Sequence, residues 1–145
     1  MDEIDEKIIE ALKKNSRSSY KEMARGTHIS DVAVHKRIKK LKGIIRKFTI
    51  LVDQKSVGKE ITAILMIKCE IGKAPEIANR LSQVEDIREV YTTVGEYDII
   101  AKIRTDNMDS LKEITEKELM DIKGLNEVRT SIVFESLKED QSLIL

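Results

Sequence analysis

Apolar residues recur at helical spacing in three consecutive segments of the first third of the chain. The first segment runs from Asp2, which suits an N-cap, to about Lys14. The second begins at Ser19, and Glu22 three residues later completes a capping box that satisfies the exposed backbone amides of a helix start. The third follows a turn at residues 26–29. This order of three short helices predicts a helix-turn-helix domain.

The third helical segment, residues 29–41, separates an apolar stripe from a basic face. At about 100° per residue, Val34, Ile38 and Leu41 fall on one side, whereas most of the lysines fall on the opposite side. Ser30 stands where an N-cap residue belongs, so the helix is expected to begin directly after it. A single basic amphipathic helix often only keeps a bundle soluble, but three helices in this order favour a DNA-recognition helix.

The exposed side of this helix supplies the candidate DNA contacts. Side chains near the helix start, together with the first lysine, suit base edges, whereas the later cations suit phosphates. Arg37 lies at the border of the apolar stripe, where it can instead tie helices together. The base-edge candidates are Val32, Ala33, His35 and Lys36, and the phosphate candidates are Arg37, Lys39 and Lys40, with Ser30 at the exposed helix end.

Residues 43–53 are rich in β-branched side chains and begin with a glycine, which predicts a short wing and a connecting strand. Arg46 and Lys47 can reach the DNA backbone from such a wing, or can keep an edge strand soluble. The charged segment that follows is expected to form a hinge. The predicted domains are a winged helix-turn-helix domain at 1–53, the hinge at 54–60, and an effector-binding and oligomerisation domain at 61–145.

The second half of the chain alternates between strand-like and helix-like segments. The order βαββαβ is that of the ferredoxin-like fold, an antiparallel sheet with two helices on one face, so the fold class is α+β. Apolar residues occupy both faces of several strands, so the open face is expected to pair with the sheet of another subunit. The predicted strands are 61–70, 87–94, 97–104 and 128–137, and the predicted helices are 75–84 and 108–122.

Two short motifs accompany this order of elements. They comprise Ser30, Ala33, Val34, Arg37, Ile38, Lys39, Lys40 and Leu41 in the recognition helix, and Gly95, Tyr97 and Asp98 between the second and third strands. From Asp2 to about Glu139 the chain resembles the Lrp/AsnC family, the leucine-responsive or feast/famine transcription regulators, whose second domain is RAM- or ACT-like. The family usually has two more residues between the recognition helix and the wing, so the wing is shortened here.

The resemblance implies a homodimer built through the C-terminal sheets, often assembled into a tetramer or octamer, that binds double-stranded promoter DNA. Two-fold symmetry then predicts a roughly palindromic operator, with half-sites about one helical turn, roughly 34–36 Å, apart or a multiple of it. The resemblance also implies a small effector, an amino acid, bound at a contact between subunits. The chain is therefore expected to be a transcription regulator and not an enzyme.

The segment between the second and third strands supplies candidate effector contacts. A free amino acid needs an acceptor for its ammonium group, donors for its carboxylate, and a shaped wall. Asp98 can accept from the ammonium, amides near Gly95 can bind the carboxylate, and Tyr91 can form the wall. Alternatively, Gly95 only permits a tight hairpin and Asp98 only caps it. The candidates are Tyr91, Thr92, Thr93, Gly95, Tyr97 and Asp98, with Thr130 and Ser131 from a neighbouring subunit.

Charge is divided unevenly along a chain that is neutral overall. Residues 1–50 contain 13 Lys and Arg against 7 Asp and Glu, whereas the remainder contains 13 against 19. This asymmetry indicates that the first half meets a polyanion and that the second half has a different task.

Metal and cofactor chemistry are not indicated by the sequence, and we expect neither. Both histidines, His28 and His35, lie in the first domain, far from Cys69, and no phosphate loop, dinucleotide fingerprint or nucleophile elbow occurs. One cysteine cannot form an intrachain disulfide, and no apolar run approaches the roughly 20 residues of a membrane span. The charged N-terminus does not resemble a signal peptide. We therefore expect a soluble, cytoplasmic protein without membrane partners.

Two other classes fit parts of this pattern. Siroheme decarboxylases combine the same helix-turn-helix and βαββαβ arrangement but are enzymes. Haem chemistry of that kind is expected to use a histidine in the second domain, and this sequence has none there. The other class is a protein that senses amino acids without binding DNA, and the lysine-rich face of the third helix argues against it.

Overall fold

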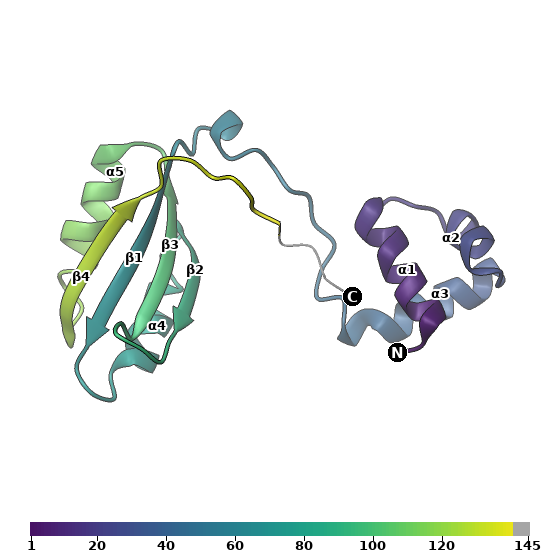
Figure 1. Ribbon diagram of the computed structural model, residues 1–145, viewed down its shortest axis with the longest axis horizontal. Helices are drawn as coiled ribbons and strands as arrows, with labels where there is room; N and C mark the ends of the chain where they lie inside the picture. Colours follow the sequence, from purple (N-terminus) through teal and green to yellow (C-terminus); the bar gives the residue numbers. More distant parts are fainter. Residues whose placement is uncertain (141–145) are drawn as a thin grey trace. The chain divides into compact units, whose positions relative to one another are not determined.

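The computed structural model describes residues 1–140 of the chain (Figure 1). They include two compact units, Met1–Leu51 and Val52–Leu137. The predicted second domain extends to residue 145, and residues 141–145 lie outside the described part of the chain. Among the residues described, no helix combines the length and apolar character needed to cross a membrane.

Three helices form the first unit, and each begins directly after its predicted capping residue. Ser19 accepts a hydrogen bond from the Glu22 amide, and Glu22 accepts one from the Ser19 amide, which confirms the predicted capping box. Asp2 caps the first helix in the same reciprocal way with Asp5, a partner that the sequence pattern did not indicate. The helices are α1 at Glu3–Lys14, α2 at Tyr20–Thr27 and α3 at Asp31–Lys40.

The apolar stripes of the three helices meet in one small core. Ile8 of α1 and Val34 of α3 are fully buried, and Met23 of α2 is almost completely buried. The predicted stripe of α3 is confirmed, because Leu41 is also buried and Ile38 packs against the same cluster. Burial of this stripe turns the opposite, lysine-rich side of α3 to solvent.

The wing and connecting strand predicted for residues 43–53 are not formed within one chain, so this prediction is wrong for the single chain. A 3-10 turn, η1 at Leu41–Gly43, follows α3, and residues 44–53 contain no strand. A strand forms only where a second strand satisfies its backbone amides and carbonyls, and none of the described strands pairs with this segment. Ile45 packs against the core of the first unit, but the other apolar side chains of the segment stay exposed, with Ile50 and Leu51 79% and 77% exposed.

The second unit has the predicted βαββαβ order. Its strands form one antiparallel sheet in the order β2-β3-β1-β4, so β1 lies between β3 and β4. Helices α4 and α5 cover one face of the sheet (Figure 1), as in the predicted ferredoxin-like fold. The strands are β1 at Ile61–Cys69, β2 at Ile87–Thr92, β3 at Ile99–Thr105 and β4 at Leu125–Ile132, and the helices are α4 at Ala74–Leu81 and α5 at Met108–Glu113.

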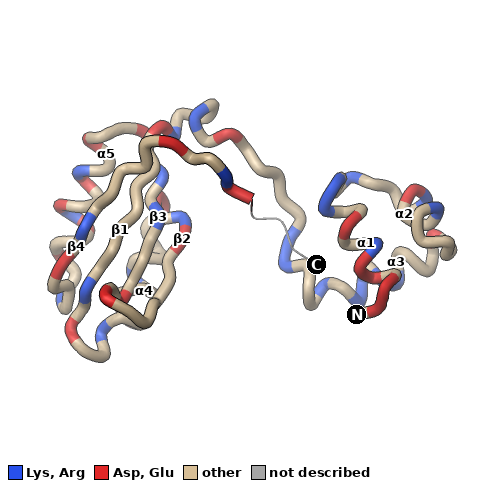
Figure 2. The backbone as a smooth tube through the Cα atoms, in the orientation of Figure 1, with Lys and Arg blue, Asp and Glu red and all other residues tan. Residues whose placement is uncertain are grey.

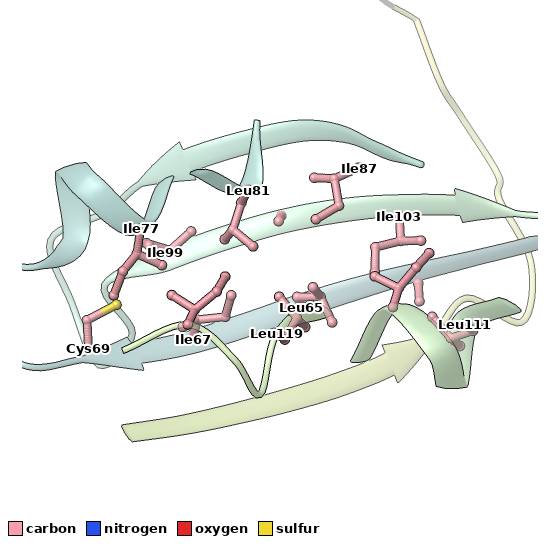
Figure 3. Packing of buried hydrophobic residues seen from close by; sticks show 14 residues of the cluster. Leu65, Ile67, Cys69, Ile77, Leu81, Ile87, Ile99, Ile103, Leu111 and Leu119 are labelled. Carbon is pink, nitrogen blue, oxygen red and sulfur yellow. The ribbon is translucent and has the colours of Figure 1, made fainter. Parts of the chain in front are cut away.

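Alternation along β1 and β3 decides which face of the sheet is buried. Leu65 and Ile67 of β1 lie fully buried with Ile99 and Ile103 of β3 in the layer between sheet and helices (Figure 3). Residues between these positions point to the opposite face, because successive side chains of a strand alternate in direction. That face carries a mixture of partly exposed apolar and charged side chains.

α5 is shorter than the helix predicted for residues 108–122. After Glu113 the backbone widens into a π turn, η3 at Ile114–Glu118, in which the Leu119 amide donates to the Ile114 carbonyl. In a regular helix Leu119 would point about 140° away from Ile114, whereas the wider turn lets both reach the core. All four residues predicted to point inward are buried, and they are Leu111, Ile114, Leu119 and Ile122.

β4 begins and ends earlier than the strand predicted for residues 128–137. Its last residue pairs with Ala63 of β1, and the next amide, that of Val133, donates to the Thr62 carbonyl at 2.8 Å. Because β1 begins only one residue before Thr62, the sheet offers the following residues no strand to pair with. Residues 134–137 therefore leave the sheet.

We predict that Leu65→Ala lowers the free energy of unfolding by about 2–5 kcal/mol, because it opens a cavity at the centre of the sheet layer. Urea unfolding followed by circular dichroism measures the change. Ile71→Ala is the matched control, since Ile71 is 104% exposed in a loop and its truncation is expected to change stability by less than about 0.5 kcal/mol. Equal effects of the two substitutions would contradict this description of the core.

Candidate functional site

α3 presents polar and basic side chains to solvent from a fixed place in the first unit. Ser30 caps the helix as predicted, and its hydroxyl oxygen lies 3.2 Å from the Ala33 amide nitrogen that donates to it. Val32 is 60% exposed, so the core makes little use of this branched apolar side chain. The other predicted contact residues with exposed side chains are His35, Lys36, Lys39 and Lys40.

His35 stacks on Tyr20 of α2, with ring centroids 5.1 Å apart and ring planes inclined by 17°. Stacking holds the imidazole by its face and leaves its nitrogens at the ring edge. Tyr20 therefore belongs to the candidate surface, although the sequence pattern placed it only at a helix start. The signal for this contact lies in the tertiary structure, because the two residues stand on different helices.

Arg37 is tied to the start of α1. Its Nη1 lies 2.8 and 2.7 Å from the two carboxylate oxygens of Asp2 and 2.7 Å from Oδ1 of Asp5. These bonds confirm the alternative interpretation in which Arg37 ties helices together. Hydrogen bonds from the Arg37 guanidinium lower the pKa of both carboxyl groups below the ordinary aspartate value, and the carboxylates raise the pKa of Arg37 in return.

An open groove lies between the start of α1 and one side of α3. Figure 2 shows the acidic start of α1 next to α3. Several predicted DNA-facing residues thus share a groove with two carboxylates, which sequence reasoning missed because the acidic partners stand more than thirty positions before Arg37. The lining residues include Asp2 and Asp5 from the α1 side and Ala33, Lys36, Arg37 and Lys40 from α3.

The β2–β3 loop, residues 93–98, holds four of the eight predicted effector residues, because both flanking strands are shorter than predicted. The Thr93 amide donates to the Asp98 carbonyl at 2.9 Å, and the Thr93 hydroxyl donates to the Tyr97 carbonyl at 2.6 Å. Oδ2 of Asp98 accepts a hydrogen bond from the Cys69 amide at 2.8 Å. Asp98 therefore caps a backbone amide at the end of β1 through one of its two carboxylate oxygens.

Gly95 is not required by the geometry of this loop. It is absent from the glycines with positive φ, and a Cβ added to it would meet no atom within 4 Å. The loop is also too long to be a tight two-residue hairpin, which was the structural reason considered from the sequence. Glycine also permits another molecule to approach the backbone closely, and the space beside this residue is open.

Tyr97 lies beside Lys68 of β1. The Lys68 ammonium nitrogen is 5.2 Å from the Tyr97 ring centroid, which is a cation–π distance. The same nitrogen lies 3.8 Å from a carboxylate oxygen of Glu96 and 3.6 Å from one of Glu127. Lys68 thus links the β2–β3 loop to β4, and nothing in the local sequence pattern distinguished it as part of the candidate site.

Within one chain, the structure does not bring Tyr91 together with Thr130 and Ser131. Tyr91 lies on β2, whereas the other two lie on β4, and β3 and β1 separate these two strands of the sheet. Thr92 is the last residue of β2 and is exposed, as is Tyr91. A site built from both groups of residues would need two copies of the chain.

Within residues 1–140, no group of three or more His, Cys, Asp and Glu side chains is placed to hold a metal ion. Cys69 is buried at the end of β1, and desolvation raises the pKa of its thiol. The reactive thiolate is therefore disfavoured.

Both units of the chain match known protein families. Residues 1–42 match the AsnC-type helix-turn-helix domain, and residues 62–143 match the Lrp/AsnC ligand binding domain. The first match includes all of α1, α2 and α3, and the second begins within β1 and continues past β4.

Relatives and solved structures agree with these matches. The chain is 38% identical to the HTH-type transcriptional regulator FL11 of Pyrococcus abyssi, over 99% of this chain and 95% of the relative. It is 31% identical to the HTH-type transcriptional regulator Ptr1 of Methanocaldococcus jannaschii, over 99% and 98%. E. coli AsnC has a TM-score of 0.91 at 27% identity, over 97% of this chain and 96% of that one. A Neisseria meningitidis transcriptional regulator in complex with L-Met has a TM-score of 0.91 at 22% identity, over 99% and 96%.

We predict a specific pH dependence for Arg37→Ala. Because folding lowers the pKa of Asp2 and Asp5, their pairing with Arg37 contributes stability that is complete above the ordinary aspartate pKa, about 3.9, and is lost as pH falls through the lower folded values. Wild type should therefore exceed the variant in free energy of unfolding at neutral pH, and the difference should shrink below about pH 4. Urea unfolding at a series of pH values measures it. A difference that stays constant into strong acid would refute the coupling.

Proposed function

Because the chain belongs to the Lrp/AsnC family of helix-turn-helix transcription regulators, we propose that it reads promoter DNA with the exposed face of α3 and senses an amino acid with the β2–β3 loop. The observation that carries the DNA assignment is the orientation of α3. Its apolar stripe is buried against α1 and α2, so three lysines and an apolar residue, Val32, face outward from a helix-turn-helix unit.

The proposed DNA contacts divide by side-chain type. Val32 and Ala33 lie in the first turn of α3, where recognition helices meet base edges, and Lys36 is the first cation able to reach them. His35 is steered by its stack on Tyr20. Lys39 and Lys40 lie in the last turn and suit phosphates, which attract cations irrespective of base sequence.

We further propose that the regulator is a homodimer joined through the open face of the sheet. Ile64 and Met66 lie on this face of the central strand, opposite the helices, and Ile100 and Tyr91 pair beside them on β3 and β2. Tyr91 is 55% and Ile100 36% exposed. Facing sheets from two copies would cover these side chains, as packed sheets do in other proteins. Two-fold symmetry would then double the α3 helices presented to a palindromic operator.

Residues 48–52 provide a second contact for the same dimer. This segment, Phe48 to Val52, is apolar except for one threonine, and its apolar side chains are 43–79% exposed. It has high β propensity but no partner strand among the described residues. Pairing with the same segment of a second copy would satisfy its backbone and complete the strand that the sequence pattern predicts.

The β2–β3 loop offers suitable chemistry for an amino-acid effector. Oδ2 of Asp98 bonds to the Cys69 amide, so Oδ1 would meet the ammonium group, while amides around Gly95 would meet the carboxylate. The open space at Gly95 supports close approach of a ligand. Thr130 and Ser131 would have to come from another copy, and the effector would then lie between subunits. The amino acid then changes DNA affinity only if it binds one assembly state more tightly than another.

We predict distinct effects for two lysine substitutions in α3. Lys36→Ala should reduce the preference for specific over random DNA by about 1–3 kcal/mol, because it removes a base-edge contact. Lys40→Ala should weaken binding to both DNAs and flatten the plot of log affinity against log salt by about one unit, because it removes a phosphate contact. Gel shifts at several salt concentrations, using DNA upstream of its own gene and random DNA, measure both effects.

The same gel shifts test the proposed function itself. Preferential, salt-sensitive binding of the upstream fragment would support a sequence-specific regulator. Failure to bind any DNA at low salt would refute the DNA-reading assignment. Identical effects of the Lys36 and Lys40 substitutions would refute the division between base-edge and phosphate contacts.

We predict that Gly95→Ala weakens effector binding without changing stability by more than about 0.5 kcal/mol, because the added methyl group meets no atom of the chain. The twenty common L-amino acids would be tested singly for a shift in thermal unfolding temperature, beginning with L-methionine. A ligand stabilises the folded protein more the more tightly it binds. An amino acid that raises the unfolding temperature of wild type should therefore raise that of the variant less. Light scattering with and without each active amino acid would report the assembly state.

Gly58→Ala is the control for this experiment. Gly58 has a φ of 85°, so its substitution should lower stability and leave ligand binding intact. If no amino acid shifts the unfolding temperature of wild type, the proposed amino-acid effector is wrong. If an amino acid raises the unfolding temperature of Gly95→Ala as much as that of wild type, the loop is not the binding site.

A further inference from the structure

The contact between Arg37 and the start of α1 is a three-residue ionic cluster within the recognition surface. One guanidinium nitrogen, Nη1, donates to Asp2 and to Asp5 at 2.7–2.8 Å. The three side chains are not equally covered, because 17% of Asp5, 29% of Arg37 and 55% of Asp2 is exposed. A partly covered arginine that bonds to two carboxylates is more constrained than an ordinary exposed ion pair.

Hydrogen bonds within α1 hold the two carboxylates in place independently of Arg37. Oδ1 of Asp2 accepts a hydrogen bond from the Asp5 amide at 3.0 Å, and Oδ2 of Asp5 accepts one from the Asp2 amide at 3.1 Å. These bonds form the capping box of α1. Neither carboxylate can therefore swing away from Arg37 without releasing an amide at the helix start, which makes the acceptor site for Arg37 rigid.

The cluster lies where DNA is proposed to approach. Arg37 stands between Lys36 and Lys40 along α3, and all three line the groove that also contains Asp2 and Asp5. A phosphate entering this groove would meet cations on α3 and two negative charges on α1. The carboxylates repel a phosphate, and they also occupy donors of Arg37 that would otherwise attract one.

We propose that Arg37 is a positioning residue of DNA recognition, which Asp2 and Asp5 hold away from the phosphate backbone. In this arrangement Arg37 fixes α3 against the start of α1, and the carboxylates lower affinity for DNA of every sequence. The affinity for a specific DNA sequence then depends more strongly on base-edge contacts near the start of α3. This role rests on the proposed DNA-binding function, and it differs from a role of Arg37 as a phosphate ligand.

The test frees Arg37 by removing the charge of its partners. Asp2→Asn/Asp5→Asn keeps an N-cap side chain able to accept the amide bonds, because asparagine caps helices as well as aspartate does. Full-length protein would be titrated against a fluorescent 30-base-pair duplex of mixed sequence at several salt concentrations. We expect about threefold to tenfold tighter binding and a salt plot steeper by roughly one unit, since Arg37 gains a phosphate. The preference for upstream over mixed-sequence DNA should fall.

Glu3→Gln/Glu6→Gln is the matched control. It removes two negative charges from the same helix turn, but neither residue bonds to Arg37, and Glu3 instead pairs with Lys7 at 2.7 Å. The control should leave the steepness of the salt plot unchanged. Equal gains in affinity from both double variants would attribute the effect to net charge and overturn the proposal.

Arg37→Ala, combined with Asp2→Asn/Asp5→Asn, completes a double-mutant cycle. Introduced into wild type it should leave the salt plot as steep as before, and introduced into Asp2→Asn/Asp5→Asn it should abolish the gain. A plot flattened by about one unit in wild type would show that Arg37 contacts phosphate directly, and would overturn the proposal. Arg37→Gln, which keeps most of the side-chain length, replaces the alanine variant if circular dichroism shows that the latter is unfolded. If wild type binds no DNA at any salt concentration, the proposed function fails and this role fails with it.

Discussion

Burial of one apolar stripe on α3 is the interaction on which the DNA-reading surface depends. Val34 is fully buried and Leu41 almost so, in the same cluster as Ile8 of α1. This packing sets the rotation of α3 about its own axis, and the rotation decides which side chains face outward. The ion pairs of Arg37 add a second, directional constraint at the other edge of the helix. Apolar packing and one ionic cluster together present the lysines in a single orientation.

The second unit follows a similar logic with a different periodicity. Alternation along the central strand β1 buries Leu65 and Ile67 beneath the helices and leaves Ile64 and Met66 on the other face. A sheet covered on one side only keeps apolar surface available for a partner. The proposed dimer would use this surface. The β2–β3 loop lies at the end of the same strands, so effector binding and subunit contact are proposed to share neighbouring residues.

Local interactions were the part of the fold that sequence reasoning predicted well. The helix starts after Ser19 and Ser30 depend on bonds between residues three positions apart, and such bonds form from neighbouring residues alone. The burial of Ile114 and Leu119 also followed from their apolar character. Their helix was predicted too long and too regular, because the π turn between them arises from fitting both side chains against the sheet.

By itself, the sequence determined the family, the order of the elements and the residues on the outer face of α3, because caps, periodicity and charge are properties of short segments. Only the tertiary structure decided that Arg37 bonds to Asp2 and Asp5, that β4 ends where β1 begins, and that residues 44–53 form no strand within one chain. Each of these outcomes depends on whether a distant segment supplies a partner for a hydrogen bond or charge, and such partners have no fixed spacing along the chain.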